Sequence, residues 1–198
     1  MPGALARKVR NKRANGSNLF QSFYPGTVIA PAPGVHNIDY YPETNYDSLS
    51  QLYVGYIIGV AQSFTGDGTK LVTAKFYLYK IGSPTGDIVA KLYDHTGTFS
   101  STGTPTGSPL ETSGVYDSSL LTTSPELIEF TFVNGHTVAD GSYYCLSCEY
   151  SGGDSSNSVY VCYDGTTPTH SGNYSFTLNY ASWTPNNGRD LIFYAISG

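Results

Sequence analysis

The sequence predicts an all-β protein: an antiparallel β-sandwich of about eight strands with jelly-roll connections and an extended N-terminal arm. Charged residues make up only 13% of the 198 residues, whereas glycine, tyrosine and proline occur 22, 18 and 11 times. Helical proteins are instead rich in Ala, Glu, Lys and Leu. From about residue 51 onward, apolar and polar residues alternate with the period of a strand. Turns rich in Gly, Pro, Asn and Ser separate the alternating stretches.

Residues 1–18 are expected to form a basic, flexible arm. They carry no acidic residue, and their basic residues are Arg7, Lys8, Arg10, Lys12 and Arg13. The rest of the chain has five basic residues against fifteen acidic ones, a net charge of −10. Such an arm is expected to bind an acidic partner, a groove of a neighbouring copy, or nucleic acid. A disordered, solubilising tail is the alternative. The acidic body itself is a poor nucleic-acid ligand.

Residues 19–50 are aromatic and rich in proline, without clear periodicity. If this segment were loose, its aromatic side chains would be exposed, which favours aggregation. We therefore expect an extended anchoring segment that is ordered only in an assembly, where it packs against a neighbouring subunit. The residues expected to make this contact are Phe20, Phe23, Tyr24, Tyr40 and Tyr41.

Residues 51–198 are expected to form the sandwich. The clearest strand is 70–80, where Val72, Ala74, Phe76 and Leu78 fall on one face and lysine and tyrosine on the other. The polar stretch 96–113 is expected to be a surface loop, and the long connection at 95–125 favours a jelly roll over an up-and-down barrel. The expected strands are 52–64, 70–80, 87–94, 126–133, 141–150, 158–163, 174–180 and 190–196.

The three cysteines do not indicate a disulfide framework, because their number is odd and no signal peptide precedes them. Cys145 and Cys148 form a single CxxC on a predicted strand. Positions i and i+3 of a strand face opposite sides, so zinc binding there is poorly supported. We interpret the cysteines as buried residues, with a Cys148–Cys162 pair left open as an alternative.

No catalytic motif is found. The sequence lacks HExxH, GxSxG and phosphate-binding loops, and His36, His95, His136 and His170 all stand beside turn residues, where solvated side chains are expected. We therefore predict a protein that is not an enzyme and needs no cofactor; a hydrolase would rest only on the existence of enzymatic sandwiches. A structural calcium ion held by loop carboxylates is the alternative, and its candidate ligands are Asp67, Asp154 and Asp164.

Tyrosine is the strongest compositional signal. Outward tyrosines on a sheet stack on sugar rings or cover a subunit contact, although tyrosine also simply favours half-buried strands. The single tryptophan, Trp183, has turn-like neighbours and is expected to plug one end of the sandwich or to cap a ligand site. The tyrosines considered for glycan or subunit contact are Tyr77, Tyr79, Tyr93, Tyr160 and Tyr163.

The sequence gives no sign of a membrane span or of a secretory signal. The most apolar run, residues 52–61, is too short to cross a bilayer. No apolar stretch follows the N-terminal charges, as a signal peptide requires. If the protein leaves a cell, we expect it to do so by assembling into a virus particle in the host cytoplasm, released by lysis.

Five segments resemble a jelly-roll domain found in virion proteins of tailed phages and in bacterial surface proteins. They are AQSFT at 61–65, FYLYK at 76–80, GSPTG at 82–86, AKLY at 90–93 and EYSGGD at 149–154. The resemblance covers about 51–198 and implies a fold rather than a function. Together with the basic arm, it suggests a structural virion protein (a capsid decoration, head fibre or minor capsid component) that binds copies of itself and other virion proteins. The alternative is a module that recognises host-surface glycans.

Overall fold

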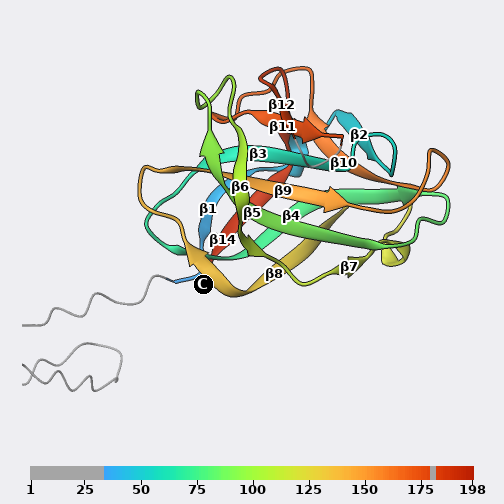
Figure 1. Ribbon diagram of the computed structural model, residues 1–198, viewed down its shortest axis with the longest axis horizontal. Coiled ribbons are helices and arrows are strands. Elements are labelled where there is room, and N and C mark those ends of the chain that lie inside the picture. The colour runs from blue at the N-terminus through green and yellow to red at the C-terminus, as the bar shows by residue number, and fades with distance from the viewer. Residues whose placement is uncertain (1–33, 179–181) are drawn as a thin grey trace, which may run out of the picture. The chain divides into compact units, whose positions relative to one another are not determined.

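The computed structural model describes residues 34–178 and 182–198, which fold into two antiparallel seven-stranded sheets (Figure 1). The all-β class and the sandwich-like arrangement predicted from the sequence are thus confirmed. The described residues contain no helix longer than the 3₁₀ turns η1 (Glu43–Asn45) and η2 (Ser118–Leu120). None of these helices has the length and hydrophobicity needed to cross a membrane.

The first sheet, sheet A, is built around β4, which pairs with β8, β10 and β14. The first described strand, β1, pairs with the last, β14, and β2 pairs with β10. Strands far apart in the sequence therefore lie side by side. The strands of sheet A are β1 (Asn37–Tyr41), β2 (Ser48–Leu52), β4 (Lys70–Ile81), β8 (Glu126–Thr137), β10 (Ser158–Asp164), β13 (Asp190–Leu191) and β14 (Phe193–Ser197).

The second sheet, sheet B, has the order β12-β11-β3-β9-β5-β6, and β7 also pairs with β5. Its two edge strands, β6 and β12, contact each other, so the sheet curls into a half-barrel (Figure 1). Asn173 holds the curl closed, because its side chain bonds both the N–H and the C=O of Gly103. The strands are β3 (Gly59–Thr65), β5 (Asp87–Thr96), β6 (Thr104–Thr112), β7 (Tyr116–Asp117), β9 (Tyr143–Tyr150), β11 (Tyr174–Thr177) and β12 (Trp183–Asn186).

The hydrophobic core lies between the two sheets. Alternate residues of each strand point into it, as the period of two requires, and Ala74, Phe76 and Leu78 of β4 are fully buried as predicted. Val72 is an exception to the predicted pattern. The pairing of β4 with β8 shifts between Leu71 and Thr73, and this irregularity places Leu71 in the core instead of Val72.

The strand pattern is finer than the eight predicted strands. The expected strand 52–64 is interrupted, because β2 ends at Leu52 and β3 begins only at Gly59. The turn between them contains Gly55 at a φ of +94°, a conformation that suits glycine. The expected loop 96–113 contains β6, an edge strand that pairs with β5. Trp183 lies in β12 rather than in a turn.

The folded unit begins earlier than residue 51. Pro33–Gly198 form one compact unit, and β1 and β2 belong to sheet A. Residues 37–50 are therefore not a loose anchoring segment, and the expectation is corrected for this stretch. The basic arm and the predicted anchoring residues Phe20, Phe23 and Tyr24 lie outside the described residues.

Candidate functional site

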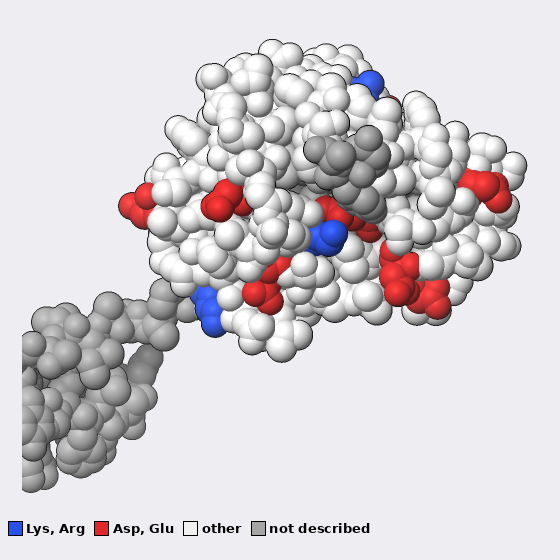
Figure 2. Space-filling view, in the orientation of Figure 1, with Lys and Arg blue, Asp and Glu red and all other residues white. Residues whose placement is uncertain are grey.

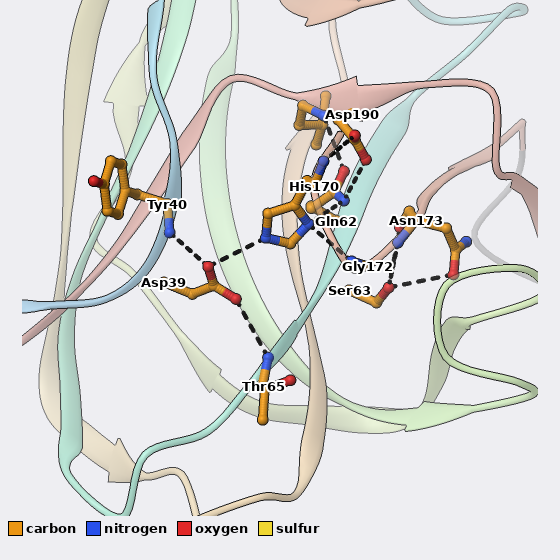
Figure 3. Close-up of polar contacts among 10 residues, drawn as sticks. Asp39, Tyr40, Gln62, Ser63, Thr65, His170, Gly172, Asn173 and Asp190 are labelled. Carbon is orange, nitrogen blue, oxygen red and sulfur yellow. Dashed lines mark hydrogen bonds and ion pairs between the residues drawn. The ribbon is translucent and has the colours of Figure 1, made fainter. Parts of the chain in front are cut away.

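A buried polar cluster joins the two sheets around His170 (Figure 3). We call Asp39, Gln62, His170 and Asp190 the His170 cluster. The imidazole Nε2 lies 3.2 Å from Asp39 Oδ1, and Nδ1 lies 3.1 Å from Gln62 Nε2. Gln62 donates to Asp190 Oδ1 at 3.0 Å, and Asp190 Oδ2 accepts the backbone N–H of His170 at 2.8 Å. The cluster thus connects β1, β3 and β13 with the loop before β11.

The geometry of His170 is that of a structural residue rather than of a general base. Its Nδ1 also accepts the backbone N–H of Gly172 at 3.0 Å, so this nitrogen is an acceptor and the ring proton sits on Nε2, facing Asp39. Only 5% of the His170 side chain is exposed. A general base needs a lone pair that reaches a substrate, and both nitrogens of His170 already have partners inside the protein.

A second buried carboxylate, that of Asp164, lies next to Asp190 of the His170 cluster and links further strands. Tyr41 donates its hydroxyl to Asp164 Oδ2 at 2.7 Å, which ties β1 to the end of β10. Asp164 and Asp190 are paired residues of β10 and β13, and both are buried. Burial raises the pKa of Asp190, and the nearby Asp164 carboxylate adds to the rise. Tyr41, expected at a subunit contact, is only 6% exposed and packs within its own domain.

The histidines differ more in their exposure to solvent than the sequence suggests. The prediction of a solvated side chain is wrong for His170, and burial lowers the pKa of His95. His36 is exposed and forms an ion pair with Asp67, its Nε2 lying 2.7 Å from Asp67 Oδ2. No sequence signal points to the His170 cluster, because Asp39 and Gln62 lie more than a hundred positions from His170 and the histidine stands among turn residues.

Six tyrosines gather on the outer face of sheet A, and we call this surface the tyrosine face. Tyr79 and Tyr160 are cross-strand neighbours whose rings stack with centroids 5.0 Å apart. Tyr40 and Tyr194 stack in the same way at 5.5 Å, and Tyr46 meets Tyr77 edge to face at 5.7 Å. Of the predicted contact residues, Tyr40, Tyr77, Tyr79 and Tyr160 are brought together here. The tyrosine face consists of Tyr40, Tyr46, Tyr77, Tyr79, Tyr160 and Tyr194.

The tyrosine face also carries charged side chains. Burial raises the pKa of Tyr79 to about 12, and the neighbouring Tyr46 contributes. Lys75, the cross-strand neighbour of Tyr194, has its Nζ 3.0 Å from Glu129 Oε2, and Tyr194 donates its hydroxyl to Glu43. Tyrosine is enriched at protein interfaces.

The other two predicted tyrosines lie elsewhere. Tyr163 is buried between the sheets, and the guanidinium of Arg189 lies 4.8 Å from its ring centre. Tyr93 lies on the side of sheet B that faces away from sheet A, where its hydroxyl donates to Glu149 Oε1 at 2.9 Å. Neither tyrosine contributes to the tyrosine face.

The side of sheet B that faces away from sheet A is also buried, although sheet A does not cover it. On β9, Leu146 and Cys148 point into the core, so Cys145, Ser147 and Glu149 point the other way, yet each is at most 1% exposed. The curl of the half-barrel encloses them. Figure 2 looks onto this side of the molecule and shows a basic group that lies beside acidic ones. We call this surface the concave face.

The calcium candidates each cap a turn. Asp67 Oδ1 accepts the N–H of Thr69, Asp154 Oδ1 accepts that of Ser156, and Asp164 Oδ1 accepts that of Thr166. Among residues 34–178 and 182–198, no three His, Cys, Asp or Glu side chains are placed to hold a metal ion. Cys148 and Cys162 lie in different sheets, and all three cysteines are free and buried.

Comparisons of the whole chain with protein-family models, with curated proteins and with solved structures find no match. The features of the described residues that bear on function are the His170 cluster, the tyrosine face and the concave face.

Proposed function

We propose that this chain is a non-enzymatic structural protein of a virus particle that assembles with further copies of itself through the tyrosine face of sheet A. Its N-terminal segment would anchor it to the particle, and its two sheets would be connected as a jelly roll, as the resemblance implies. The observation that carries the proposal is the tyrosine face itself, with its three ring pairs on one side of one sheet.

The composition of this face supports a protein partner. Tyrosine offers a flat apolar ring and a hydroxyl, and it is enriched at interfaces, where lysine and glutamate are depleted from the centre. Lys75 lies beside Tyr194 on this face, where its charge is paired with that of Glu129. The rings are held in place by each other, so little side-chain freedom remains to be lost on binding.

Charge and connectivity support a second copy as that partner. The described residues contain five basic and fifteen acidic side chains, whereas residues 1–33 contain five basic and no acidic ones. A basic segment from one copy therefore complements the acidic body of another. The segment joins the sandwich just before β1, the strand that carries Tyr40 of the tyrosine face.

The His170 cluster supports a role without catalysis. Both ring nitrogens of His170 are hydrogen-bonded within the protein, and the hydroxyl of Ser63, drawn in Figure 3, is bonded to Asn173. A nucleophile within hydrogen-bond reach of a base is the expected signature of covalent catalysis.

Sedimentation velocity over a wide concentration range tests the proposal. The full chain is expected to form oligomers, and the variant Tyr79→Ser/Tyr160→Ser is expected to stay monomeric at concentrations where the wild type assembles. The control is Tyr53→Ser/Tyr56→Ser, which removes another stacked pair, with centroids 5.3 Å apart, from the turn after β2. A wild-type chain that stays monomeric, or a control as defective as the test variant, would overturn the proposal.

Recognition of glycans is a second candidate function. The concave face favours it, because Trp183 and Tyr93 meet there edge to face at 6.2 Å beside the ion pair of Lys91 and Glu149. Aromatic rings next to charged hydrogen-bonding groups suit the two faces of a sugar. This function is compatible with assembly, since it uses the opposite sheet.

A further inference from the structure

The contact that closes the curl of sheet B lies next to a histidine. The Asn173 side chain accepts the N–H of Gly103 at 3.0 Å and donates to its C=O at 2.9 Å, and we call this contact the Gly103–Asn173 clasp. A Cβ at Gly103 would lie 2.4 Å from His95 Nε2 and 2.6 Å from Asn173 Oδ1. The imidazole of β5 and the amide of the loop before β11 therefore reach the same point of the backbone, because glycine has no side chain there.

His95 Nε2 is a buried polar atom that has no hydrogen-bond partner among the described residues. The imidazole packs on aromatic rings instead: the ring centres of Phe99 and Tyr143 lie 6.0 and 5.6 Å from it, and these two rings stack on each other at 4.1 Å. Unpaired polar atoms are rare in protein interiors and need an explanation. A neutral imidazole with its proton on Nδ1 fits this place, because Nε2 then carries no N–H that needs an acceptor.

Protonation of His95 would place a new N–H beside the clasp. Both nitrogens of an imidazolium are donors. The oxygen close by, Asn173 Oδ1, already accepts the N–H of Gly103 and lies 3.3 Å from the hydroxyl of Ser63, which Figure 3 shows bonded to it. The new donor must therefore compete with Gly103 for this oxygen, or it stays buried with an unpaired charge, which is costly. Protonation of His95 and closure of the clasp thus oppose each other.

The surroundings of His95 do not favour its charged form. Its cross-strand neighbour on β6 is Pro105, and the titratable ring that meets it from β9, Tyr143, is neutral below about pH 10. Asp94, the preceding residue of β5, falls on the opposite side of the strand. Within residues 34–178 and 182–198 no charged group adds to the pKa shift of His95, and burial lowers that pKa. The closed form is therefore fully stable above about pH 6.5, the ordinary histidine value, and loses stability as the pH falls below it.

We propose that His95 makes the closure of the half-barrel sensitive to acid. The neutral imidazole fits beside the closed clasp. The imidazolium competes with the Gly103 N–H for Asn173 Oδ1 and releases the turn between β5 and β6 from the loop before β11. Acid thereby loosens the curl that encloses the concave face. The inference is independent of assembly through the tyrosine face, which lies on the other sheet.

Hydrogen exchange of the full chain tests the proposal, because the N–H of Gly103 reports on the clasp itself. Exchange is followed at pH 7.5 and 5.0 by mass spectrometry with fragmentation to single residues, and is corrected for the intrinsic pH dependence of amide exchange. We expect the corrected exchange of Gly103 to be at least about fivefold faster at pH 5.0, since one proton changes an opening equilibrium by up to about tenfold per pH unit. The control is the N–H of Ser113, which bonds the C=O of Ala90 in the same sheet and should not change. Equal corrected rates for Gly103 at the two pH values, or the same acceleration at Ser113, would overturn the proposal.

Two variants separate His95 from a general effect of acid. His95→Phe keeps an aromatic ring but takes up no proton, so its Gly103 N–H should exchange equally at both pH values. His136→Phe is the matched control, because His136 also packs against a tyrosine ring but lies on β8 of the other sheet, and it should keep the wild-type response. Acceleration that persists in His95→Phe would refute the role of His95. If that variant fails to fold, exchange of the ring C2 hydrogen of His95 in the wild type decides, since its pH dependence reports the pKa of this residue. A value at or above about 6.5 would overturn the proposal, and a lower one would support it.

Discussion

The hydroxyl of Tyr41 donates a 2.7 Å hydrogen bond to the carboxylate of Asp164, although the two residues are 123 positions apart. The same hydroxyl accepts the backbone N–H of Thr169 at 3.2 Å. Because Asp164 also accepts the N–H groups of Thr166 and Thr167, one buried carboxylate fastens β1, the end of β10 and the following loop. The first described strand is therefore locked to the sandwich from its inner side.

Replacing Tyr41 by phenylalanine tests this fastening. The change removes the hydroxyl and leaves Asp164 buried with one donor fewer, so the free energy of unfolding should fall by about 2 kcal/mol. Urea denaturation measures the effect. The adjacent Tyr40 is 49% exposed and serves as the control, since Tyr40→Phe should change the free energy by less than about 0.5 kcal/mol. Similar losses of unfolding free energy in both variants would show that the buried hydrogen bond of Tyr41 stabilises the fold no more than the exposed hydroxyl of Tyr40 does.

A glycine next to the His170 cluster permits a close backbone contact. A Cβ at Gly172 would lie 1.9 Å from the carbonyl oxygen of Ser63, whereas one at Gly114 would meet nothing within 4 Å. Gly172→Ala should therefore lower the free energy of unfolding by about 3 kcal/mol, because the two segments must move apart. Gly114→Ala is the matched control and should stay close to wild type. Equal midpoints of chemical denaturation for the two variants would contradict the close contact.

His36 should make stability depend on pH at the start of the described chain. Its pKa is raised, first by the hydrogen bond with the Gly34 carbonyl and then by the Asp67 carboxylate. A raised pKa in the folded state means that the stabilising contribution is full below about 6.5, the ordinary histidine value, and is lost as pH rises through the folded-state pKa. Wild type should therefore exceed His36→Gln in stability by more at pH 5.5 than at pH 8.5. An equal or larger advantage at pH 8.5, measured by urea denaturation, would refute this.

The three thiols should be unreactive in the native protein. Cys145, Cys148 and Cys162 are buried and free, and burial raises the pKa of each, that of Cys162 to about 12. Since the thiolate is the reactive form, a disulfide reagent such as DTNB should react at least about a hundredfold more slowly with native than with unfolded protein. Three thiols per chain should appear in guanidinium. A native thiol that reacts at the rate of free cysteine would contradict the burial.

The sequence was most informative for a strand with one buried side and one partly exposed side. In β4, Ala74, Phe76 and Leu78 alternate with Lys75, Tyr77 and Tyr79, so both its core side and its outer side follow from the period of two. The edge strand β6 carries no such signal. Much of it is exposed and it contains two prolines, so the alternation that marks half-buried strands is missing.

The candidate site was predictable only in part, because it depends on which strands pair. Tyr77 and Tyr79 could be placed on an outer face from their own strand. Their meeting with Tyr160 and with the Tyr40–Tyr194 stack requires the order β1-β14-β4-β10, in which the first and last described strands are neighbours. Local patterns do not contain that order. The same holds for the His170 cluster, which joins residues from four separate segments.

Hydroxyl-radical footprinting of the full chain at low and high concentration tests directly whether the tyrosine face becomes buried when the chain assembles. Mass spectrometry would report the oxidation of individual tyrosines. We expect oxidation of Tyr40 and Tyr160 to fall several-fold in the assembled sample, while that of Tyr56 and Tyr143, which are both 47% exposed and are not part of this face, stays the same. Unchanged oxidation of Tyr40 and Tyr160, or protection of Tyr56 and Tyr143 instead, would contradict it.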